Sequence, residues 1–432
     1  MKYLEIKKAE DLAGMLSSFS PEHLDDTTLP KFYYNNTMPI RMGNNYSSPL
    51  EDLFEDCTMT VGTNAHLLSG HGGCGKSTEL VNLKQRLEKD GQPVYLFRSE
   101  LEMNMYLADC WDIMLFVTEG LCNIAHKHEI NLSNATLQAV FDYIKKDMEE
   151  VETTETSSTF GIGVVLSFFA SIKSNLQFGT KTRTIIKEKM ERRASEWLRH
   201  IREISDKIAY EMGGKLPILI FEGFDKIQPP ERALDIFRHD ILTKMPFPII
   251  YTFPIALTYD SRFASIESFY RVHVLPMIKV SNADKTENDD GIEVMRKIVE
   301  LRADLKLFDK GALDELIKQT GGVLRHLFQC IITASRLARR RGSDKIEMED
   351  SRLALSDLSS MLSKRISDAD LDMLARIFND LNYKKRIEDR ESLLKQMHAL
   401  VVLEYKNGDR WQDLHPLIAE FLIEQGVINV KK

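Results

Sequence analysis

The chain has 432 residues, a formal net charge of −8, 43% apolar residues and 28% charged residues. This composition is typical of a soluble globular protein with a sizeable core, and the length predicts about three domains. The negative charge argues against a globally basic nucleic-acid-binding surface but leaves a local basic patch open. The first twenty residues lack the features of a secretory signal peptide, and the five cysteines form no C-x-x-C pair. We therefore expect a cytoplasmic protein with reduced thiols and no membrane contact.

Residues 1–60 are expected to form an irregular N-terminal arm. After a short helical stretch they contain TLPKFYYNNTMPIRMGNNYSSPL, which is rich in Asn, Pro, Ser and aromatic residues and has no clear period. Such a segment packs as a whole without forming a regular layer of its own.

Residues 61–280 have the pattern of an α/β core. An apolar strand, a glycine-rich loop and an amphipathic helix that stops at Gly91 are followed at once by a second strand. This strand–helix–strand order predicts a parallel sheet with right-handed crossovers. The later runs are apolar throughout, as in central strands covered on both faces. The predicted strands are HLLSG from residue 66 and residues 93–101, 216–222, 247–253 and 271–280.

An insertion over residues 127–200 has an unusual middle. In FGIGVVLSFFASIKSNLQF, starting at Phe160, nearly every even-numbered position is apolar, which is a period of two and not a helical one. We expect an amphipathic β-hairpin over residues 158–180, followed by a basic helix. The hairpin either folds back on its own sheet or offers a surface for a partner or for self-assembly.

Helices dominate the C-terminal part of the chain. Residues 285–350 are expected to form a small helical lid domain. In residues 351–432, helices precede two strand-like runs on either side of Asn407-Gly408, a strong hairpin signal. This order predicts a winged-helix domain.

The segment from Gly70 to Thr78 carries the clearest chemistry. It fits G-x-x-x-x-G-K-[ST] between a strand and a helix, where glycines let successive backbone N–H groups and the helix N-terminus face phosphates. Lys76 should reach the β and γ phosphates, and the Ser77 hydroxyl should ligate Mg²⁺. ATP and Mg²⁺ are thus the predicted cofactors. The expected phosphate-binding residues are Gly70, Gly72, Gly73, Cys74, Gly75, Lys76, Ser77 and Thr78.

Two acids follow the strand LPILIFE, at the sheet edge where ligands of open α/β folds bind. Glu222 would hold the metal through water, and Asp225 would orient or deprotonate the attacking water. Either acid could instead cap a helix. Thr252, at the end of the next strand, either senses the γ-phosphate or bonds backbone groups.

Three arginines are candidates for contacts with the nucleotide. Arg325 follows two glycines in TGGVLRHL and could reach over the nucleotide from the lid, or lie in solvent. Arg262 and Arg271, near the fifth strand, would act in trans if the protein forms rings, although surface arginines are common there.

Together, the P-loop, the acidic strand, the Thr-tipped strand, the G-G-x-x-R helix start and the terminal winged helix resemble the AAA+ and STAND branch of P-loop ATPases over residues 60–425. Leu414-His415-Pro416-Leu417 resembles the STAND M-H-D-L motif, whose histidine touches ADP. The resemblance implies that His415 senses the nucleotide, although Pro416 replaces the aspartate and a structural role is the alternative.

The resemblance also has consequences for catalysis. Glu222 stands where such families usually carry aspartate, and Gly223 stands where AAA+ enzymes place a catalytic glutamate. Slow hydrolysis is therefore expected, with Asp225 as the remaining acid. ATP and ADP would stabilise different placements of the helical and winged domains.

The leading hypothesis is a slowly hydrolysing ATPase switch that controls self-assembly or a separate effector subunit, by analogy with bacterial conflict systems that include antiphage defence. The alternative is an origin-recognition-like ATPase that binds DNA. Its support is the basic run Arg336, Arg339, Arg340 and Arg341, which could equally complement a helix dipole. A third reading is a scaffold that binds ATP for structural integrity only. The sequence leaves open the stimulus, the partner, the oligomer number and the base, which would contact the N-terminal arm.

Overall fold

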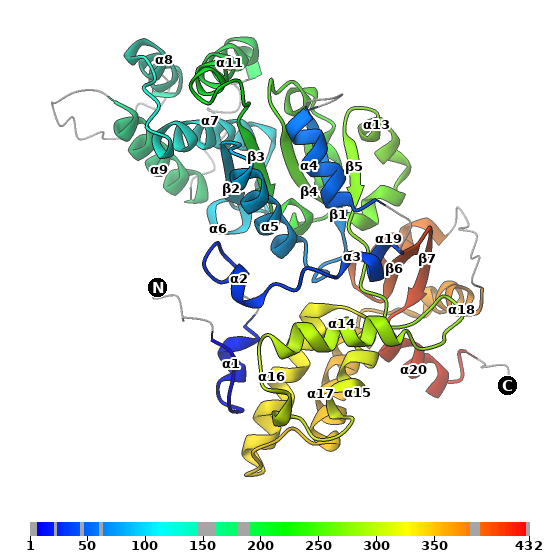
Figure 1. Cartoon of the computed structure of the whole chain (residues 1–432). Coiled ribbons are helices and arrows are strands. Elements are labelled where there is room, and N and C mark those ends of the chain that lie inside the picture. The colour runs from blue at the N-terminus through cyan, green and yellow to red at the C-terminus, as the bar shows by residue number, and fades with distance from the viewer. Residues whose placement is uncertain are drawn as a thin grey trace.

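A computed structural model of the chain describes residues 7–20, 24–43, 47–59, 64–145, 161–178, 191–380 and 389–428. Figure 1 shows an α/β unit stacked on a helical unit, with the N-terminal arm running between them. One sheet of five strands lies at the centre of the α/β unit. Its strands are β1 (Ala65–Gly70), β2 (Val94–Arg98), β3 (Ile218–Glu222), β4 (Ile249–Pro254) and β5 (Arg271–Val274).

The strands are all parallel, in the order β2-β3-β4-β1-β5. This arrangement confirms the predicted α/β fold. Two strands are shorter than expected. The second ends at Arg98 because the chain turns into a helix at Ser99, and the fifth ends at Val274, two residues before Pro276, which has no N–H for the ladder. Because the strands are parallel, the carboxyl ends of β1, β3 and β4 lie at the same edge of the sheet.

Side chains alternate between the two faces of the sheet, as the period of a strand requires. Leu67, Leu219 and Tyr251 belong to one buried cluster, which includes α7 and α11. Leu68 and Ile220 belong to the opposite cluster, which includes α4 and α5. Both faces are thus covered, in agreement with the apolar runs of the sequence.

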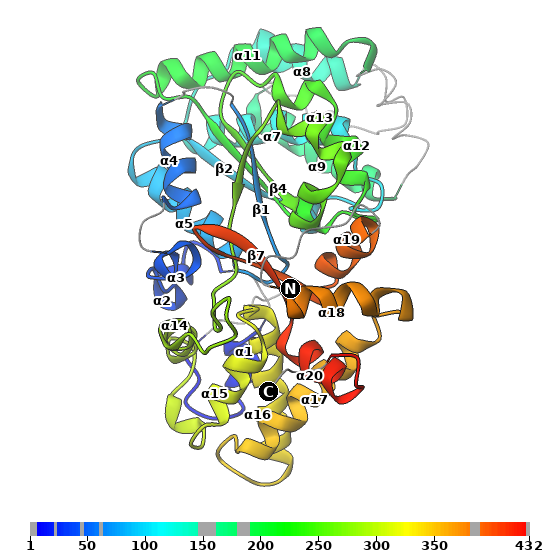
Figure 2. The same cartoon turned by 90° about the vertical axis from the view of Figure 1, so that its right-hand side faces the viewer.

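Helices surround this sheet on both faces. Figures 1 and 2 show α8 and α11 at the end of the molecule remote from the helical unit. The helices are α4 (Pro49–Met59), α5 (Lys76–Lys89), α6 (Ser99–Glu102), α7 (Cys110–Lys127), α8 (Asn134–Lys145), α9 (Ile162–Phe178), α11 (Ala194–Glu211), α12 (Arg232–Phe237) and α13 (Ala264–Glu267).

The predicted hairpin in the insertion is wrong, because Ile162–Phe178 form the helix α9. Val165, Phe168 and Phe169 are spaced by three and four residues, and all are buried against α7 and α8. The Phe168 ring lies 4.6 Å from that of Phe141, between centroids. Odd-numbered apolar residues complete a helical face that the even-numbered pattern concealed. Residues 158–160 and 179–180 of the prediction lie outside the described residues.

The N-terminal arm contains the short helices α1 (Met15–Ser18), α2 (Leu29–Phe32) and α3 (Met38–Met42) before α4, and its limits stay a prediction. Its start is part of the helical unit. Ala9 pairs with the backbone at Arg302 and Asp304, and Met15 and Phe19 are fully buried in the core of that unit. Helix α4 packs on the sheet instead, against α5 and β5.

The helical unit contains α14 (Asp289–Glu300), α15 (Ala312–Gln319), α16 (Leu324–Arg340) and α17 (Met348–Ser363). The chain then forms α18 (Leu371–Asn379), α19 (Arg390–His398), the antiparallel hairpin of β6 (Val402–Asn407) and β7 (Asp409–Leu414), and α20 (Pro416–Glu424). The hairpin turns at Asn407-Gly408, as predicted. Helix α17 continues across the expected boundary at residue 350, and the winged-helix assignment and the domain limits stay predictions. Within the described residues, no helix is long and apolar enough to cross a membrane.

Candidate nucleotide-binding site

The P-loop joins the carboxyl end of β1 to the first residue of α5. Gly73 and Gly75 have φ angles of +80° and +104°, in the left-handed region that favours glycine. At Gly73 space is also short, because a Cβ atom there would lie 2.6 Å from the Cβ of Arg325. The glycines of the motif therefore allow both the curl of the loop and the close approach of α16.

Lys76 begins α5 and folds back over the loop. Its Nζ donates to the carbonyl oxygens of Gly70 (2.8 Å) and His71 (3.0 Å) and lies 2.9 Å from Oδ2 of Asp225. Burial alone would lower the pKa of Lys76, but the Asp225 carboxylate reverses the shift, so this pKa is raised. Burial likewise opposes ionisation of Asp225, yet the Lys76 charge holds its pKa below the ordinary value. The two side chains form a buried ion pair at the centre of the loop.

Thr252 positions Asp225 from the neighbouring strand. The Thr252 Oγ1 accepts hydrogen bonds from the backbone N–H of Gly223 (2.9 Å) and of Asp225 (3.4 Å), and the Thr252 side chain helps to hold the pKa of Asp225 below its ordinary value. This threonine is fully buried. Thr252 therefore holds the acidic turn through backbone bonds, and its contact with the γ-phosphate stays a prediction.

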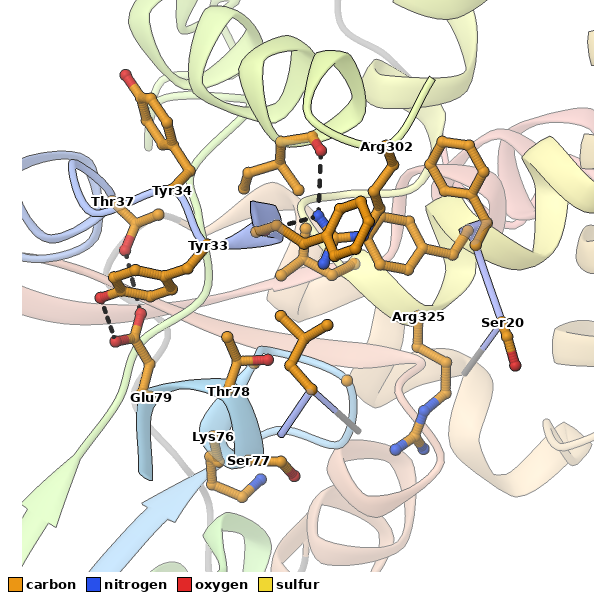
Figure 3. Close-up of a pocket in the computed structure, with 18 of the residues that line it drawn as sticks. Ser20, Tyr33, Tyr34, Thr37, Lys76, Ser77, Thr78, Glu79, Arg302 and Arg325 are labelled. Carbon is orange, nitrogen blue, oxygen red and sulfur yellow. Dashed lines mark hydrogen bonds between the residues drawn. The ribbon is translucent and has the colours of Figure 1, made fainter. Parts of the chain in front are cut away.

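A cavity of about 1170 Å³, counting the solvent at its mouth, lies beside the loop. Figure 3 shows that Lys76, Ser77 and Thr78 come from one side, Tyr33 and Tyr34 from the arm, and Arg302 and Arg325 from the helical unit. The cavity is polar at the P-loop and aromatic at the arm. Its lining includes Phe19, Phe32, Tyr33, Tyr34, Thr37, Arg41, Gly73, Gly75, Lys76, Ser77, Thr78, Asp225, Arg302, Arg325 and Phe328.

Two buried arginines in this lining were not identified from the sequence. Arg41 donates through Nη2 to the carbonyl of Cys74 (2.8 Å) and through Nη1 to that of Pro276. Arg302 donates to the carbonyl of Phe32 (3.0 Å), and its guanidinium lies 4.8 Å from the ring centroid of Phe328. These bonds attach the arm to the P-loop and to the helical unit. From the sequence, the base is expected to contact the N-terminal arm, and Tyr33 and Tyr34 of that arm belong to this lining.

A second cavity, of about 1020 Å³ including its open side, lies on the other side of the P-loop. Gly70, His71 and Gly72 line it together with residues of the C-terminal unit, by which we mean the described residues from 364 to 428, and these include Arg365 and His398. Asp225 and Arg325 line both cavities. The structure therefore brings Arg325 to the loop, and its contact with a nucleotide stays a prediction.

Other predicted residues lie farther from these cavities. Glu222 is buried at the end of β3, and neither lining includes it among the described residues. His415 directly precedes α20 and is absent from both linings among the described residues. Its Nε2 lies 3.1 Å from Nδ1 of His326, and His326 lines the second cavity. The metal-binding role of Glu222 and the sensing role of His415 stay predictions.

The other arginines that were singled out from the sequence are exposed at the surface. Arg262 pairs with Asp260 (2.7 Å), and Arg271 pairs with Asp56 of α4. Arg336, Arg339 and Arg340 are exposed at the end of α16, and Arg341 bonds Glu347 and Asp350, each at 2.7 Å. A role in trans for Arg262 or Arg271 stays a prediction.

No protein-family model and no curated protein matches the sequence. Solved structures resemble the chain at low identity. A Walker-type ATPase of Pyrococcus abyssi is 14% identical with a TM-score of 0.45, over 88% of this chain and 96% of that one. The Aeropyrum pernix ORC2 protein in ADPNP–ADP complexes is 13% identical with a TM-score of 0.44, over 94% and 98%. Domain III of the Thermotoga maritima replication initiation protein DnaA is 12% identical with a TM-score of 0.38, over 78% and 98%. Scores this low carry no conclusion about function. The structure itself establishes an α/β fold in which a P-loop joins the first strand and helix of a parallel sheet.

Proposed function

We propose that the protein binds and slowly hydrolyses ATP with Mg²⁺, and that the bound nucleotide sets the placement of its helical and C-terminal units. The observation that carries the proposal is the buried pair of Lys76 and Asp225, 2.9 Å apart, inside a P-loop that the arm, the helical unit and the C-terminal unit all contact. A nucleotide in this place would lie beside the arm, the helical unit and the C-terminal unit.

The residues of the loop suit a triphosphate. The N–H groups of the curled loop and the first turn of α5 face anionic oxygens, and Lys76 leaves Asp225 to meet the β and γ phosphates. Hydroxyl and carboxylate oxygens are the donors that Mg²⁺ prefers, so Ser77 would hold the ion, which neutralises phosphate charge when bound.

Asp225 is then available for hydrolysis. Without nucleotide, Lys76 outweighs the effect of burial and holds the pKa of Asp225 below its ordinary value, and after Lys76 moves to the phosphates Lys226 and Thr252 still favour the carboxylate. It accepts a hydrogen bond from a water that attacks the γ-phosphorus, the bond to the bridging oxygen breaks so that ADP departs, and the proton of the water passes to an oxygen of the released phosphate. The ionised Asp225 carboxylate is a weak base, so it would orient the water better than it would remove a proton from it, in keeping with slow turnover.

The C-terminal hairpin is attached to the P-loop directly. The backbone N–H of Glu404 donates to Nε2 of His71 (2.8 Å), and the Tyr405 hydroxyl donates to the carbonyl of Gly321 (2.8 Å) in the helical unit. Lys279 donates to the carbonyl of Lys406 (2.7 Å). Movement of the P-loop on binding or hydrolysis would therefore act on the hairpin, which supports the switch.

The proposal is tested by Mg²⁺-dependent ATP hydrolysis together with mass photometry of the parent, Lys76→Ala and Asp225→Ala. We expect Lys76→Ala to lose ATP binding, and Asp225→Ala to keep binding but hydrolyse about 10²- to 10⁴-fold more slowly. An ATP-built larger species should persist longer in Asp225→Ala than in the parent. Equal behaviour of all three proteins would overturn the proposal and favour the scaffold reading.

The alternative function, origin-recognition-like binding of DNA, is favoured by one feature. Arg336, Arg339 and Arg340 are exposed together at one end of α16, on a chain that is otherwise acidic. The names of the similar solved structures fit this alternative better than the STAND one, although the likeness itself carries no argument. Salt-dependent duplex DNA binding that disappears when the three arginines become alanine would support it. An effector subunit and a role in antiphage defence stay predictions.

A further inference from the structure

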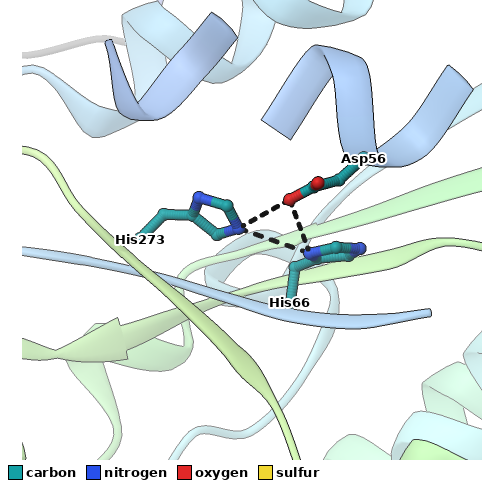
Figure 4. A group of neighbouring side chains, drawn as sticks. All are labelled: Asp56, His66 and His273. Atoms are coloured by element: carbon teal, nitrogen blue, oxygen red, sulfur yellow. Dashed lines mark hydrogen bonds and ion pairs between the residues drawn. The ribbon is translucent and has the colours of Figure 1, made fainter. Parts of the chain in front are cut away.

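Three side chains that the ATPase does not use meet on the far side of the sheet from α7. Asp56 comes from α4, His66 from β1 and His273 from β5, and Figure 4 shows their polar ends pointing toward one another. His66 is four residues before the P-loop begins, at the opposite end of the same strand. The cluster therefore joins the arm to the edge of the sheet, away from the nucleotide.

The distances within the cluster fit the ligands of a single metal ion. His66 Nδ1 lies 3.3 Å from His273 Nε2, and Asp56 Oδ2 lies 3.9 Å and 3.6 Å from these two nitrogens. Ligand atoms about 2.0–2.1 Å from a tetrahedral ion are about 3.3–3.4 Å apart. An ion would need inward movements of a few tenths of an ångström at most.

The Asp56 carboxylate gives an independent reason to expect a ligand. Asp56 is 8% exposed, and in the described part of the chain its Oδ2 is buried without a hydrogen-bond partner. Both histidine nitrogens are too far for a hydrogen bond to this oxygen. A buried carboxylate oxygen without a partner is costly, and a cation between it and the two rings would satisfy it.

Arg271 is the cationic group beside the cluster, and it does not occupy the central space. Its guanidinium bonds Oδ1, the other oxygen of Asp56, from the solvent side, where its side chain is 50% exposed. A cation on Oδ2 leaves this pair in place. The positive charge of Arg271 nevertheless opposes the binding of a cation nearby. Removal of this charge should therefore tighten metal binding.

We propose that Asp56, His66 and His273 bind one divalent transition-metal ion of the Zn²⁺ type through Oδ2, Nδ1 and Nε2. Two imidazoles and one carboxylate suit Zn²⁺ better than Mg²⁺ or Ca²⁺, which prefer oxygen ligands. A water would complete the coordination. The ion would tie α4 to β1 and β5 and so hold the strand that carries the P-loop.

The experiment uses the full chain, stripped with a chelator and titrated with Zn²⁺ against a chromophoric competitor. We expect one bound equivalent in the parent. His66→Gln, His273→Gln and Asp56→Asn should each weaken binding by at least about 10-fold. The matched control is His200→Gln, because His200 is also buried and lies 3.4 Å from a carboxylate, that of Glu203. Lys76→Ala should bind like the parent, which separates this site from the nucleotide site.

Two further measurements decide the outcome if a variant is unstable. Co²⁺ added to the parent should give the intense visible bands of a four- or five-coordinate site, and Arg271→Ala should bind Zn²⁺ more tightly because a repulsive charge is removed. The proposal is overturned if the parent binds no more Zn²⁺ than the cluster variants, or if Co²⁺ gives only the weak bands of an octahedral aquo ion.

Discussion

The backbone N–H of Glu404 donates a 2.8 Å hydrogen bond to Nε2 of His71, across 333 residues of sequence. His71 is the second residue of the P-loop motif, and Glu404 lies in β6 of the C-terminal hairpin. Burial, with a further contribution from Lys76, lowers the pKa of His71 to about 3, so the imidazole is neutral and Nε2 remains an acceptor at physiological pH. The loop that would hold phosphates is thus bonded to the unit that would report on them.

His71→Leu should separate nucleotide binding from the C-terminal hairpin. The substitution leaves the buried Glu404 N–H without an acceptor, at a cost of about 1–3 kcal/mol, while His71→Gln offers an oxygen near the position of Nε2. Hydrogen exchange of β6 should be faster in His71→Leu and no longer depend on ATP or ADP, with ATP still bound. His71→Gln is the control and should stay close to the parent. Unchanged protection of β6 in His71→Leu would contradict the coupling.

Glu404→Gln should change how stability depends on pH. Burial raises the pKa of Glu404 from 4.5 to about 7, against the opposing charges of Arg410 and Lys406. The folded state therefore binds the proton more tightly, and this contribution is fully present below pH 4.5 and is lost as pH rises to about 7. A neutral glutamine avoids the loss, so we expect the variant to be more stable than the parent by about 1–3 kcal/mol at pH 8 and nearly equal to it near pH 4.5.

Thermal unfolding at a series of pH values measures this effect. The exposed Glu391 provides the control, because Glu391→Gln should follow the parent at every pH. A parallel shift of Glu404→Gln across the whole range would indicate a packing effect instead of titration.

Gly73→Ala should weaken ATP binding by at least about 10-fold, because an added Cβ atom would lie 2.6 Å from the Cβ of Arg325 and the φ angle of +80° is strained for alanine. Gly214→Ala is the matched control. Gly214 has a φ angle of +93°, but a Cβ atom there would meet nothing within 4 Å. The control should lose about 1–2 kcal/mol of stability from strain alone and bind ATP normally. Equal ATP affinities in the two variants, measured by calorimetry, would show that the contact between the loop and α16 is unimportant.

The sequence predicted the parts of the site that follow from local rules. The glycine–lysine spacing identified the P-loop, and apolar runs ending in Glu222 and Thr252 identified the strands that deliver acid and hydroxyl to one edge. Asp225 and Arg325 each lie within a few residues of such an element and are found at the P-loop, while their roles toward a nucleotide stay predictions. The glycine pattern also requires the left-handed turns that the structure shows at Gly73 and Gly75.

The parts that were missed depend on contacts between distant segments. Arg41 and Arg302 bond backbone carbonyls 33 and 270 residues away, and no local pattern predicts such partners. The cluster of Asp56, His66 and His273 likewise needs three elements to meet. In α9, Val165, Phe168 and Phe169 are buried, whereas Val164 and Ala170 of the alternating pattern are exposed, and tertiary packing decides between the two periods.

Thr252→Val should slow ATP hydrolysis more than it weakens ATP binding. The variant keeps the shape of the side chain but removes the acceptor for the N–H groups of Gly223 (2.9 Å) and Asp225 (3.4 Å), and the hydroxyl that helps to lower the pKa of Asp225. Loss of a buried hydrogen bond costs about 1–3 kcal/mol, so kcat should fall by about 10-fold or more while KM changes little. Thr118→Val removes an equally buried hydroxyl, bonded to the carbonyl of Met114 in α7 at 3.1 Å, far from the loop. It should lower the melting temperature without changing kcat. If both valine variants keep the parent kcat, Thr252 contributes to the sheet alone, and Asp225 is held in place by Lys76 without its help.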